Sequence, residues 1–170
     1  KKNLSRCVCT LRPKSEGGLF VGKEDERKSI LRLIAEYNPF LLDVEFNTIQ
    51  KDKKLASYLK KSKCKLLISW HDFKKTPNES QLKSRLKKME KFSNVVKIVT
   101  VAKNVSDASR LLSLYSVKSK NKMVAFCMGD QGKFSRILCL HLGSPFTYVS
   151  LGKAIAPGQF SVDEIKSLEN

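Results

Sequence analysis

Short apolar segments alternate with amphipathic helical segments along the chain, and this alternation restricts the fold more than any other feature. Six apolar segments are expected to be strands, at residues 6–11, 40–46, 66–70, 95–101, 123–128 and 146–151. No hairpin-type turn joins any two of them. Strands that are separated by helices pair in parallel, with the helices packed outside the sheet. The sequence therefore predicts an α/β fold of six strand–helix units.

The helical segments have apolar side chains at helical spacing, and two of them have well-defined starting points. Helices are predicted at residues 24–37, 51–61, 77–92, 106–115 and 135–142, and after residue 161. Thr76 is the predicted N-cap of the third helix, with Pro77 as its first residue and Glu79 closing a capping box. Ser161 and Glu164 have the same spacing at the start of the last helix. Both starts are predicted to be capping boxes.

Length and composition predict one folded domain covering residues 1–170. A chain of 170 residues with 41% hydrophobic content can bury a sizeable core. No stretch reaches the roughly 18 to 20 apolar residues of a membrane span, and residues 1–12 lack the apolar segment of a signal peptide. A cytoplasmic location is therefore expected. The five cysteines show no CxxC pair and no zinc-type spacing, so reduced thiols are expected.

The net charge of +17, from 33 Lys+Arg against 16 Asp+Glu, suggests nucleic acid as an alternative partner. The lysines lie mainly on predicted helix faces and in loops. They are not interleaved with the aromatic residues that stack on bases, and no RNA-binding motif is present. A solvated outer face explains them equally well, so a basic nucleic-acid-binding module is the less favoured alternative.

Lys97 is the most unusual residue of the predicted sheet, because it interrupts the apolar run Val95 to Val101. If this strand lies at an edge of the sheet, the charge prevents a neighbouring chain from pairing with it. If the strand is internal, Lys97 points into an interior with little water. There desolvation lowers the pKa of an amine and lets it attack a carbonyl carbon to form a Schiff base.

His71 follows the apolar run Leu66 to Trp70, so we expect it in the loop that leaves the third strand. In parallel α/β folds the chemistry takes place at this end of the strands. A histidine alone is more often a structural residue. A histidine one strand–helix unit before a buried lysine is placed to move the protons that Schiff-base chemistry needs.

Several other charged residues follow the ends of predicted strands. Arg12 and Glu16 lie in the glycine-containing loop after the first strand, where Arg12 is expected either to form a surface ion pair with Glu16 or to bind an anion or hydroxyl group. Asp43 and Glu45 share one face of the second strand, and Lys97 is a candidate partner for them. Arg136 follows a glycine-containing turn at a helix start, where it is either solvated or a carboxylate or phosphate ligand.

The motifs TLRPKSEGG, LDVEF, SWHDFKKTP, VKIV, FCMGDQGKFSR and APGQFS occur in this order. Together they resemble the type I 3-dehydroquinate dehydratases, the Schiff-base enzymes of the shikimate pathway. The sequences of the motifs are most similar to those of archaeal members. HDFxxTP and APGQ are specific at this spacing, whereas a strand lysine alone is not. The resemblance covers essentially the whole chain and implies a (β/α)₈ TIM barrel, of which the sequence contains six units.

The resemblance also implies a role for each candidate residue. Lys97 would form an imine with the C3 ketone of 3-dehydroquinate, and His71 would remove the C2 proton and protonate the leaving C1 hydroxyl. Glu16 would orient His71 and balance its charge. The predicted substrate-binding residues are Arg136 for the carboxylate, and Gln159 and Arg12 for other oxygens. The product would be 3-dehydroshikimate, with no metal and no organic cofactor.

Two departures from the family pattern affect these expectations. Ile155 occupies the position of a substrate-binding serine found in many members. The family's first two strands, including a Glu-x-Arg motif that binds substrate, should precede Arg6, so we expect an N-terminally incomplete barrel. A homodimer is expected from the resemblance alone. Another class I aldolase-type lyase would share the strand lysine, but HDFKKTP and APGQ argue against it.

Overall fold

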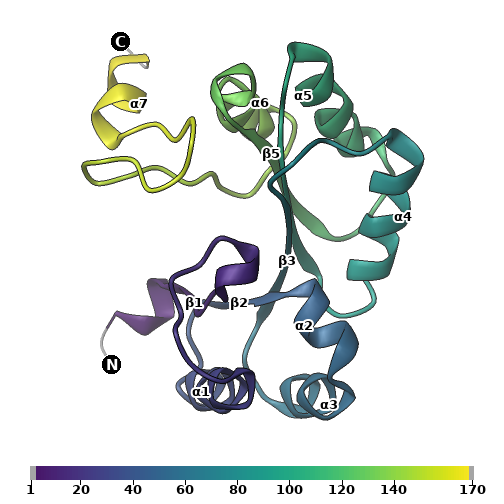
Figure 1. Ribbon diagram of the computed structural model, residues 1–170, viewed down its shortest axis with the longest axis vertical. Coiled ribbons are helices and arrows are strands. Elements are labelled where there is room, and N and C mark those ends of the chain that lie inside the picture. Colours follow the sequence, from purple (N-terminus) through teal and green to yellow (C-terminus); the bar gives the residue numbers. More distant parts are fainter. Residues whose placement is uncertain (1–2, 169–170) are drawn as a thin grey trace. The chain divides into compact units, whose positions relative to one another are not determined.

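The computed structural model describes residues 3–168, and its strands form one five-stranded sheet (Figure 1). The strands are β1 (Val8–Thr10), β2 (Leu41–Glu45), β3 (Leu66–Asp72), β4 (Val95–Val101) and β5 (Lys122–Met128), in the order β1-β2-β3-β4-β5. β1, β2 and β3 pair in parallel, with Thr10 opposite Asp43 and Glu45 opposite Ser69. The predicted α/β architecture is confirmed.

Helices connect the strands, as the alternating sequence pattern predicts. They are α1 (Glu24–Glu36), α2 (Phe46–Lys51), α3 (Lys53–Lys61), α4 (Glu79–Met89), α5 (Val105–Leu112), α6 (Ser135–His141) and α7 (Val162–Leu168). Short 3₁₀ turns are η1 (Leu4–Arg6), η2 (Lys14–Glu16), η3 (Ser113–Ser116) and η4 (Asp130–Gly132). Across residues 3–168, no helix has the length and apolar character that a membrane crossing requires.

The chain forms two compact units, which are described separately. Within the described residues, the first unit comprises 3–70 and 87–97, and the second comprises 71–86 and 98–168. β3 and β4 each contribute residues to both units. Whether residues 1–170 act as one domain stays a prediction.

The first unit buries the apolar faces of its helices against β2. α1 lies beside α3 (Figure 1), and Leu31, Leu55 and Leu59 on these helices are buried. Burial of each leucine side chain contributes about 1.5–3 kcal/mol. All five residues of β2 are buried, with Leu42 and Val44 alternating with the acidic residues of the strand. β2 therefore places two carboxylates on the face opposite its apolar side chains.

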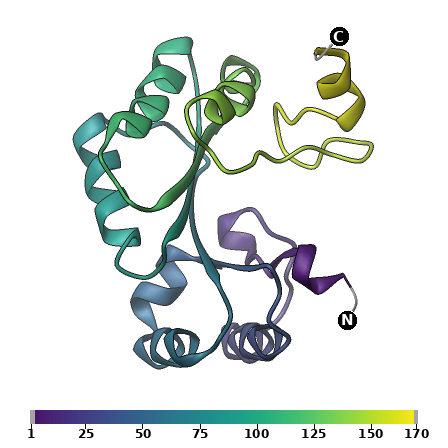
Figure 2. The same cartoon turned by 180° about the vertical axis from the view of Figure 1, so that it is seen from behind.

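The second unit packs α5 and α6 against β5, as Figures 1 and 2 show. Its buried core joins residues of β4, α5, β5 and α6, namely Val99, Leu112, Val124, Phe126, Met128 and Cys139. Phe146 and Tyr148 pack against this core from the chain that follows α6. That chain then runs as a long loop to α7, the yellow helix of Figure 2.

The predicted sixth strand at residues 146–151 is wrong, because this segment joins no sheet in the described part of the chain. Its single bridge is between Ser150 and Ser161. The Ser150 amide donates to the carbonyl oxygen of Phe160 at 2.9 Å, and the Val162 amide donates to that of Ser150 at 2.9 Å. The alternating aromatic side chains instead cover the core, since Tyr148 lies 6.2 Å from Phe126 between ring centroids. The period-two pattern therefore reflects packing rather than strand pairing.

The predicted start of the third helix is also wrong by two residues. Asn78 caps α4: its Oδ1 accepts from the Gln81 amide at 2.9 Å, and the Gln81 side chain accepts from the Asn78 amide at 3.3 Å. The Thr76 hydroxyl is used elsewhere, because it contacts Thr100 Oγ1 at 2.7 Å and donates to the Val101 carbonyl. A threonine whose hydroxyl bonds to a neighbouring strand cannot cap the helix that follows it.

Two other predicted helix starts can be compared with the structure, and one of the two predictions is confirmed. The predicted helix at 51–61 is divided at Asp52, which caps α3 by accepting from the Leu55 amide at 2.8 Å. The capping box before α7 is confirmed, with distances of 2.7 Å and 3.1 Å between Ser161 and Glu164. These helix starts follow the local rule that side-chain acceptors bind the free amides of the first turn.

Candidate active site

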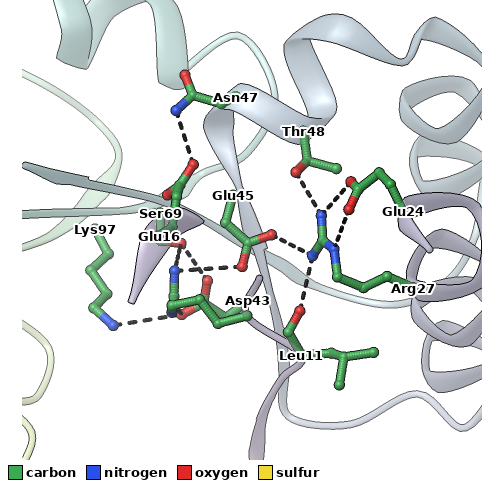
Figure 3. A network of polar contacts seen from close by, with 11 residues as sticks. Leu11, Glu16, Glu24, Arg27, Asp43, Glu45, Asn47, Thr48, Ser69 and Lys97 are labelled. Atoms are coloured by element: carbon green, nitrogen blue, oxygen red, sulfur yellow. Dashed lines mark hydrogen bonds and ion pairs between the residues drawn. The ribbon is translucent and has the colours of Figure 1, made fainter. Parts of the chain in front are cut away.

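Lys97 is buried in β4, which has a neighbouring strand on each side of it in the sheet order. Its exposed fraction is 8%, so the edge-strand interpretation is wrong. Lys97 Nζ lies 3.6 Å from Asp43 Oδ2 (Figure 3), which confirms the predicted pairing with β2. The buried amine therefore lies beside a carboxylate in an environment with little water.

Asp43 is held by two further polar groups. Arg12 Nη2 donates to Asp43 Oδ2 at 2.7 Å, and Ser69 Oγ donates to Oδ1 at 2.5 Å. Arg12 Nη1 also donates to Ser69 Oγ at 3.1 Å. The side chain of Arg12 is 13% exposed, so Arg12 is not the surface residue that one sequence interpretation expected. The Asp43 carboxylate beside Lys97 is thus already paired with a guanidinium group.

Glu45 lies on the same face of β2 and links this cluster to α1. Its Oε2 accepts from Arg27 Nη1 at 2.7 Å, and its Oε1 lies 3.5 Å from Arg12 Nη1. Burial raises the pKa of Glu45, while the two guanidinium groups oppose that rise. Figure 3 shows the resulting row of charged side chains from Arg27 to Lys97.

Glu16 lies at the end of η2 and is buried despite its charge. Its Oε1 accepts from Asn47 Nδ2 at 2.9 Å. Burial raises the pKa of the Glu16 carboxyl, and the hydrogen bond from Asn47 and the charge of Arg12 partly counter this. A carboxyl group with a raised pKa in a polar cluster is typical of functional sites.

The loop between β1 and α1 fixes Arg12 through its backbone. The carbonyl oxygen of Pro13 accepts from the amides of Glu16 and Gly18, at 3.0 Å and 2.9 Å. The carbonyl oxygen of Arg12 accepts from the Phe20 amide at 3.4 Å. A Cβ atom on Gly18 would lie 1.9 Å from the Arg12 carbonyl oxygen. Only glycine allows the loop to fold back this closely.

The Gly18→Ala variant is therefore expected to lose about 1–3 kcal/mol of stability, the usual cost of overpacking. Because the displaced backbone includes Arg12, the position of the Arg12 side chain is also expected to depend on this loop. Gly152→Ala is the matched control, because a Cβ atom there meets no atom within 4 Å. Thermal unfolding followed by circular dichroism measures both. Equal melting temperatures for the two variants would show that the close approach has no energetic consequence.

Arg136 lies on α6 in the second unit and is 2% exposed. Its guanidinium carbon lies 4.4 Å from the centroid of the Phe126 ring, and its Nη2 donates to the Pro157 carbonyl at 3.2 Å. Its Nε has no hydrogen-bond partner, and no carboxylate among residues 3–168 pairs with it. Burial lowers the pKa of Arg136 to about 10. The group stays cationic at neutral pH and can bind an anion.

Gln159 lies in the APGQ loop of the second unit, near the residue that contacts Arg136. Its side chain is buried, and its Oε1 accepts from the Ile155 amide at 3.1 Å. Gly158 has φ 68°, and a Cβ atom on it would lie 2.7 Å from the Gly129 carbonyl oxygen. The side chain of Ile155 is 90% exposed. The loop is thus held in shape by glycine and by the Gln159 amide.

His71 is the second-to-last residue of β3 rather than a loop residue, so the strand extends further than the sequence pattern indicated. Its ring is half-buried and stacks on Phe73, with 5.9 Å between centroids and 17° between planes. The predicted site residues therefore fall into two groups. The first unit contains Arg12, Glu16 and Lys97, and the second contains His71, Arg136 and Gln159.

Three polar residues of the first unit were not identified from the sequence: Arg27, Ser69 and Asn47. A pattern for Arg27 existed, because it precedes Leu31 by four residues and so lies on the buried face of its helix. A pattern for Ser69 also existed, because side chains alternate along β3 and Ser69 therefore shares a face of the strand with His71, two positions later. Asn47 could not be found in this way, since its contact with Glu16 depends on how two loops fold.

The comparisons with known proteins agree on one family. The family model for type I 3-dehydroquinase matches residues 2–169. A 3-dehydroquinate dehydratase from Pyrobaculum aerophilum is 41% identical over 158 residues, which is 92% of this chain and 50% of the relative. Another from Dehalococcoides mccartyi is 38% identical over 161 residues, which is 93% of this chain and 72% of the relative. The chain thus spans between half and three quarters of these relatives.

Solved structures give the same result. A type I 3-dehydroquinate dehydratase from Clostridium difficile has TM-score 0.83 and 27% identity, over 94% of this chain and 65% of that one. A 3-dehydroquinate dehydratase from Aquifex aeolicus has TM-score 0.77 and 31% identity, over 94% of this chain and 70% of that one. The strands and helices described above are therefore part of the (β/α)₈ barrel fold of these enzymes. By sequence and by structure, the chain belongs to the type I 3-dehydroquinase family.

Proposed function

We propose that the chain carries the Schiff-base chemistry of a 3-dehydroquinate dehydratase, with Lys97 as the nucleophile. The observation that supports this most directly is the burial of Lys97 in an internal strand, beside a carboxylate that Arg12 already binds. A buried amine is easier to deprotonate than a solvated one, and the neutral amine attacks a ketone. Family membership supports 3-dehydroquinate as the ketone.

The proposed reaction needs only side chains of the protein. Lys97 Nζ adds to the C3 carbonyl carbon, and water leaves as the imine forms. The protonated imine then accepts the electron pair of the C2–H bond when the C2 proton is removed. The resulting enamine expels the C1 hydroxyl as water, and a further water hydrolyses the imine to release 3-dehydroshikimate and the free amine. The imine acts as the electron sink, so this sequence requires no metal and no organic cofactor.

His71 is the proposed proton carrier, because it is a histidine at the end of the strand that precedes the lysine strand. It would take the C2 proton and pass a proton to the departing C1 hydroxyl. Glu16 would orient this imidazole and balance its positive charge. A buried carboxyl group of raised pKa is suited to pairing with an imidazole that changes charge during turnover.

The substrate-binding residues are proposed from family membership, and for Arg136 also from its burial and its unsatisfied Nε. Arg136 would bind the substrate carboxylate, since it is a buried cation with no carboxylate partner among the described residues. Gln159 and Arg12 would bind other oxygens of the substrate. The solved Clostridium difficile relative contains covalently modified comenic acid. That relative supports a site at which small organic acids bind.

Borohydride trapping tests this proposal directly. Incubation of the chain with 3-dehydroquinate and sodium borohydride is expected to give a stable secondary amine, found by peptide mass analysis on Lys97. The Lys97→Met variant keeps every other lysine and measures their background labelling. An adduct that survives in Lys97→Met, or no adduct in the unsubstituted chain, would overturn the proposal. An aldolase-type lyase would give the adduct without the ultraviolet absorbance of the conjugated enone product.

The cytoplasmic location and the homodimer stay predictions. Sedimentation of the chain at several concentrations measures its oligomeric state.

A further inference from the structure

Arg27 is a fully buried cation behind the candidate active site, and every one of its donors is used. Its side chain is 0% exposed. Nε and Nη2 donate to the two carboxylate oxygens of Glu24, at 2.8 Å and 2.7 Å. Nη2 also donates to Thr48 Oγ1, and Nη1 donates to the Leu11 carbonyl oxygen and to Glu45 Oε2 (Figure 3). A guanidinium group has five N–H donors, so its position is fully determined.

Arg27 is the outer end of a row of alternating charges that leads to Lys97. The order is Arg27, Glu45, Arg12, Asp43 and Lys97, with separations of 2.7, 3.5, 2.7 and 3.6 Å. Burial alone would lower the pKa of Arg27, but the hydrogen bonds and charges of Glu24 and Glu45 raise it above its ordinary value. Arg27 therefore remains a cation, and so Glu45 always has a positive partner.

The charges of this row balance without Lys97. When ionised, Asp43 and Glu45 contribute two negative charges, which the guanidinium groups of Arg12 and Arg27 match. Glu24 is 48% exposed and lines a hollow of about 750 Å³, so water screens its charge. Glu16, the other buried carboxylate among the described residues of this unit, is the proposed partner of His71. A neutral Lys97 amine is then compatible with the charge of its surroundings.

We propose that Arg27 is a positioning residue for Lys97. By binding Glu45, Arg27 leaves Arg12 bound to Asp43. Because its charge is then matched by a guanidinium group, Asp43 does not retain Lys97 as an ammonium. The inference rests on the proposed function. Without Arg27, the ionised Glu45 is left with Arg12, whose Nη1 already lies 3.5 Å from Glu45 Oε1, as its cationic partner, and it draws the guanidinium group away. Asp43 is then left to pair with Lys97, which stabilises the charged amine. The effect passes through two ion pairs and needs no contact between Arg27 and the substrate.

Two substitutions in this row have opposite expected effects. The rate of borohydride trapping on Lys97 is measured against pH, and its midpoint reports where the amine loses its proton. In Arg27→Met the midpoint is expected to rise by about one pH unit, because the row gains net negative charge. In Glu45→Gln it is expected to fall by a similar amount. The double variant Arg27→Met/Glu45→Gln is expected to return towards the original midpoint, and Arg27→Lys is expected to restore much of it.

Lys28→Met is the matched control, because it removes one positive charge from the next residue of α1. Lys28 pairs with Asp25 at 3.4 Å and Asp52 at 3.0 Å, outside the row. Its midpoint is expected to stay unchanged. A purely structural role of Arg27 would lower trapping rates without moving any midpoint, and that result would overturn the inference. If Arg27→Met does not fold, Glu45→Gln alone tests the proposal. An unchanged or raised midpoint of trapping in Glu45→Gln contradicts it.

A second measurement separates this inference from the proposed function. Reductive ¹³C-methylation labels the lysines, and the Lys97 resonance is identified by its absence in Lys97→Met. Its titration by NMR is expected to show the same order of midpoints: Glu45→Gln below the unsubstituted chain, and Arg27→Met above it. Failure of trapping in every variant would count against the proposed function. Trapping with unchanged midpoints, and an unchanged NMR order, would count against the role of Arg27.

Discussion

The Lys97→Met variant is expected to turn over 3-dehydroquinate about four orders of magnitude more slowly than the unsubstituted chain, or not measurably. Methionine preserves the length of the side chain and its packing in β4, but it has no nucleophilic amine. Without the imine, the electrons of the C2–H bond have no acceptor, so the elimination loses its low-energy route. The appearance of the conjugated enone in ultraviolet absorbance measures the rate. Retention of a tenth of the activity would contradict a covalent role for this lysine.

A His71→Gln variant provides the contrast that assigns the two roles separately. Loss of a general acid–base group typically slows a reaction by about 10²–10⁴-fold. The Lys97 amine remains in this variant, so borohydride is still expected to trap the adduct. A variant that fails both in trapping and in turnover would place His71 in imine formation or in folding rather than in proton transfer alone. Circular dichroism of both variants checks that they fold.

The Arg27→Met variant is expected to lose about 3–5 kcal/mol of stability, the usual cost of removing one partner from a buried ion pair. The loss leaves the buried Glu45 carboxylate with Arg12, at 3.5 Å, as its remaining cation among the described residues, and it removes the Arg27 donors from the Leu11 carbonyl and the Thr48 hydroxyl. For a chain of this length, such a loss lowers Tm by roughly 10 °C. Urea unfolding measures the free energy of unfolding.

Two further variants test the cause of this destabilisation. The double variant Arg27→Met/Glu45→Gln is expected to regain much of the loss, because it leaves no unpaired charge in the interior. Lys28→Met lies beside Arg27 on α1 and is expected to change stability by less than about 0.5 kcal/mol. If Arg27→Met costs no more than Lys28→Met, the buried pair contributes nothing to folding. If the double variant is as unstable as Arg27→Met, packing rather than charge determines the cost.

Local sequence patterns identified the residues that carry the proposed chemistry. Lys97 stood out because valines and isoleucine surround it, although this pattern left open whether the strand was internal or at an edge of the sheet. Asp43 and Glu45 were placed on one face of β2 because strand side chains alternate with period two. The capping box at Ser161 and Glu164 depends on contacts three residues apart, and for that reason it was predicted correctly.

The errors arose where a side chain had a partner far away in the sequence. Thr76 has the correct spacing to cap α4, but its hydroxyl contacts Thr100 on β4. Residues 146–151 alternate like a strand, but their aromatic side chains pack on the core around β5, and the Ser150 amide bonds to the segment before α7. Local propensity indicates what a segment can form, and the neighbouring segments determine what it does form.

The sequence by itself determined the alternating α/β architecture and the family of this chain, but it left Lys97 either at a sheet edge or in the interior. The tertiary structure alone decided that Arg12 binds Asp43 across 31 positions and that Arg27 binds Glu45 across 18. These pairs depend on the register of β1 against β2 and on where α1 packs. Register is a relation between segments, and charged groups pair only within a few ångströms. Since no local pattern specifies such distances, the charge balance around Lys97 became visible only in the folded chain.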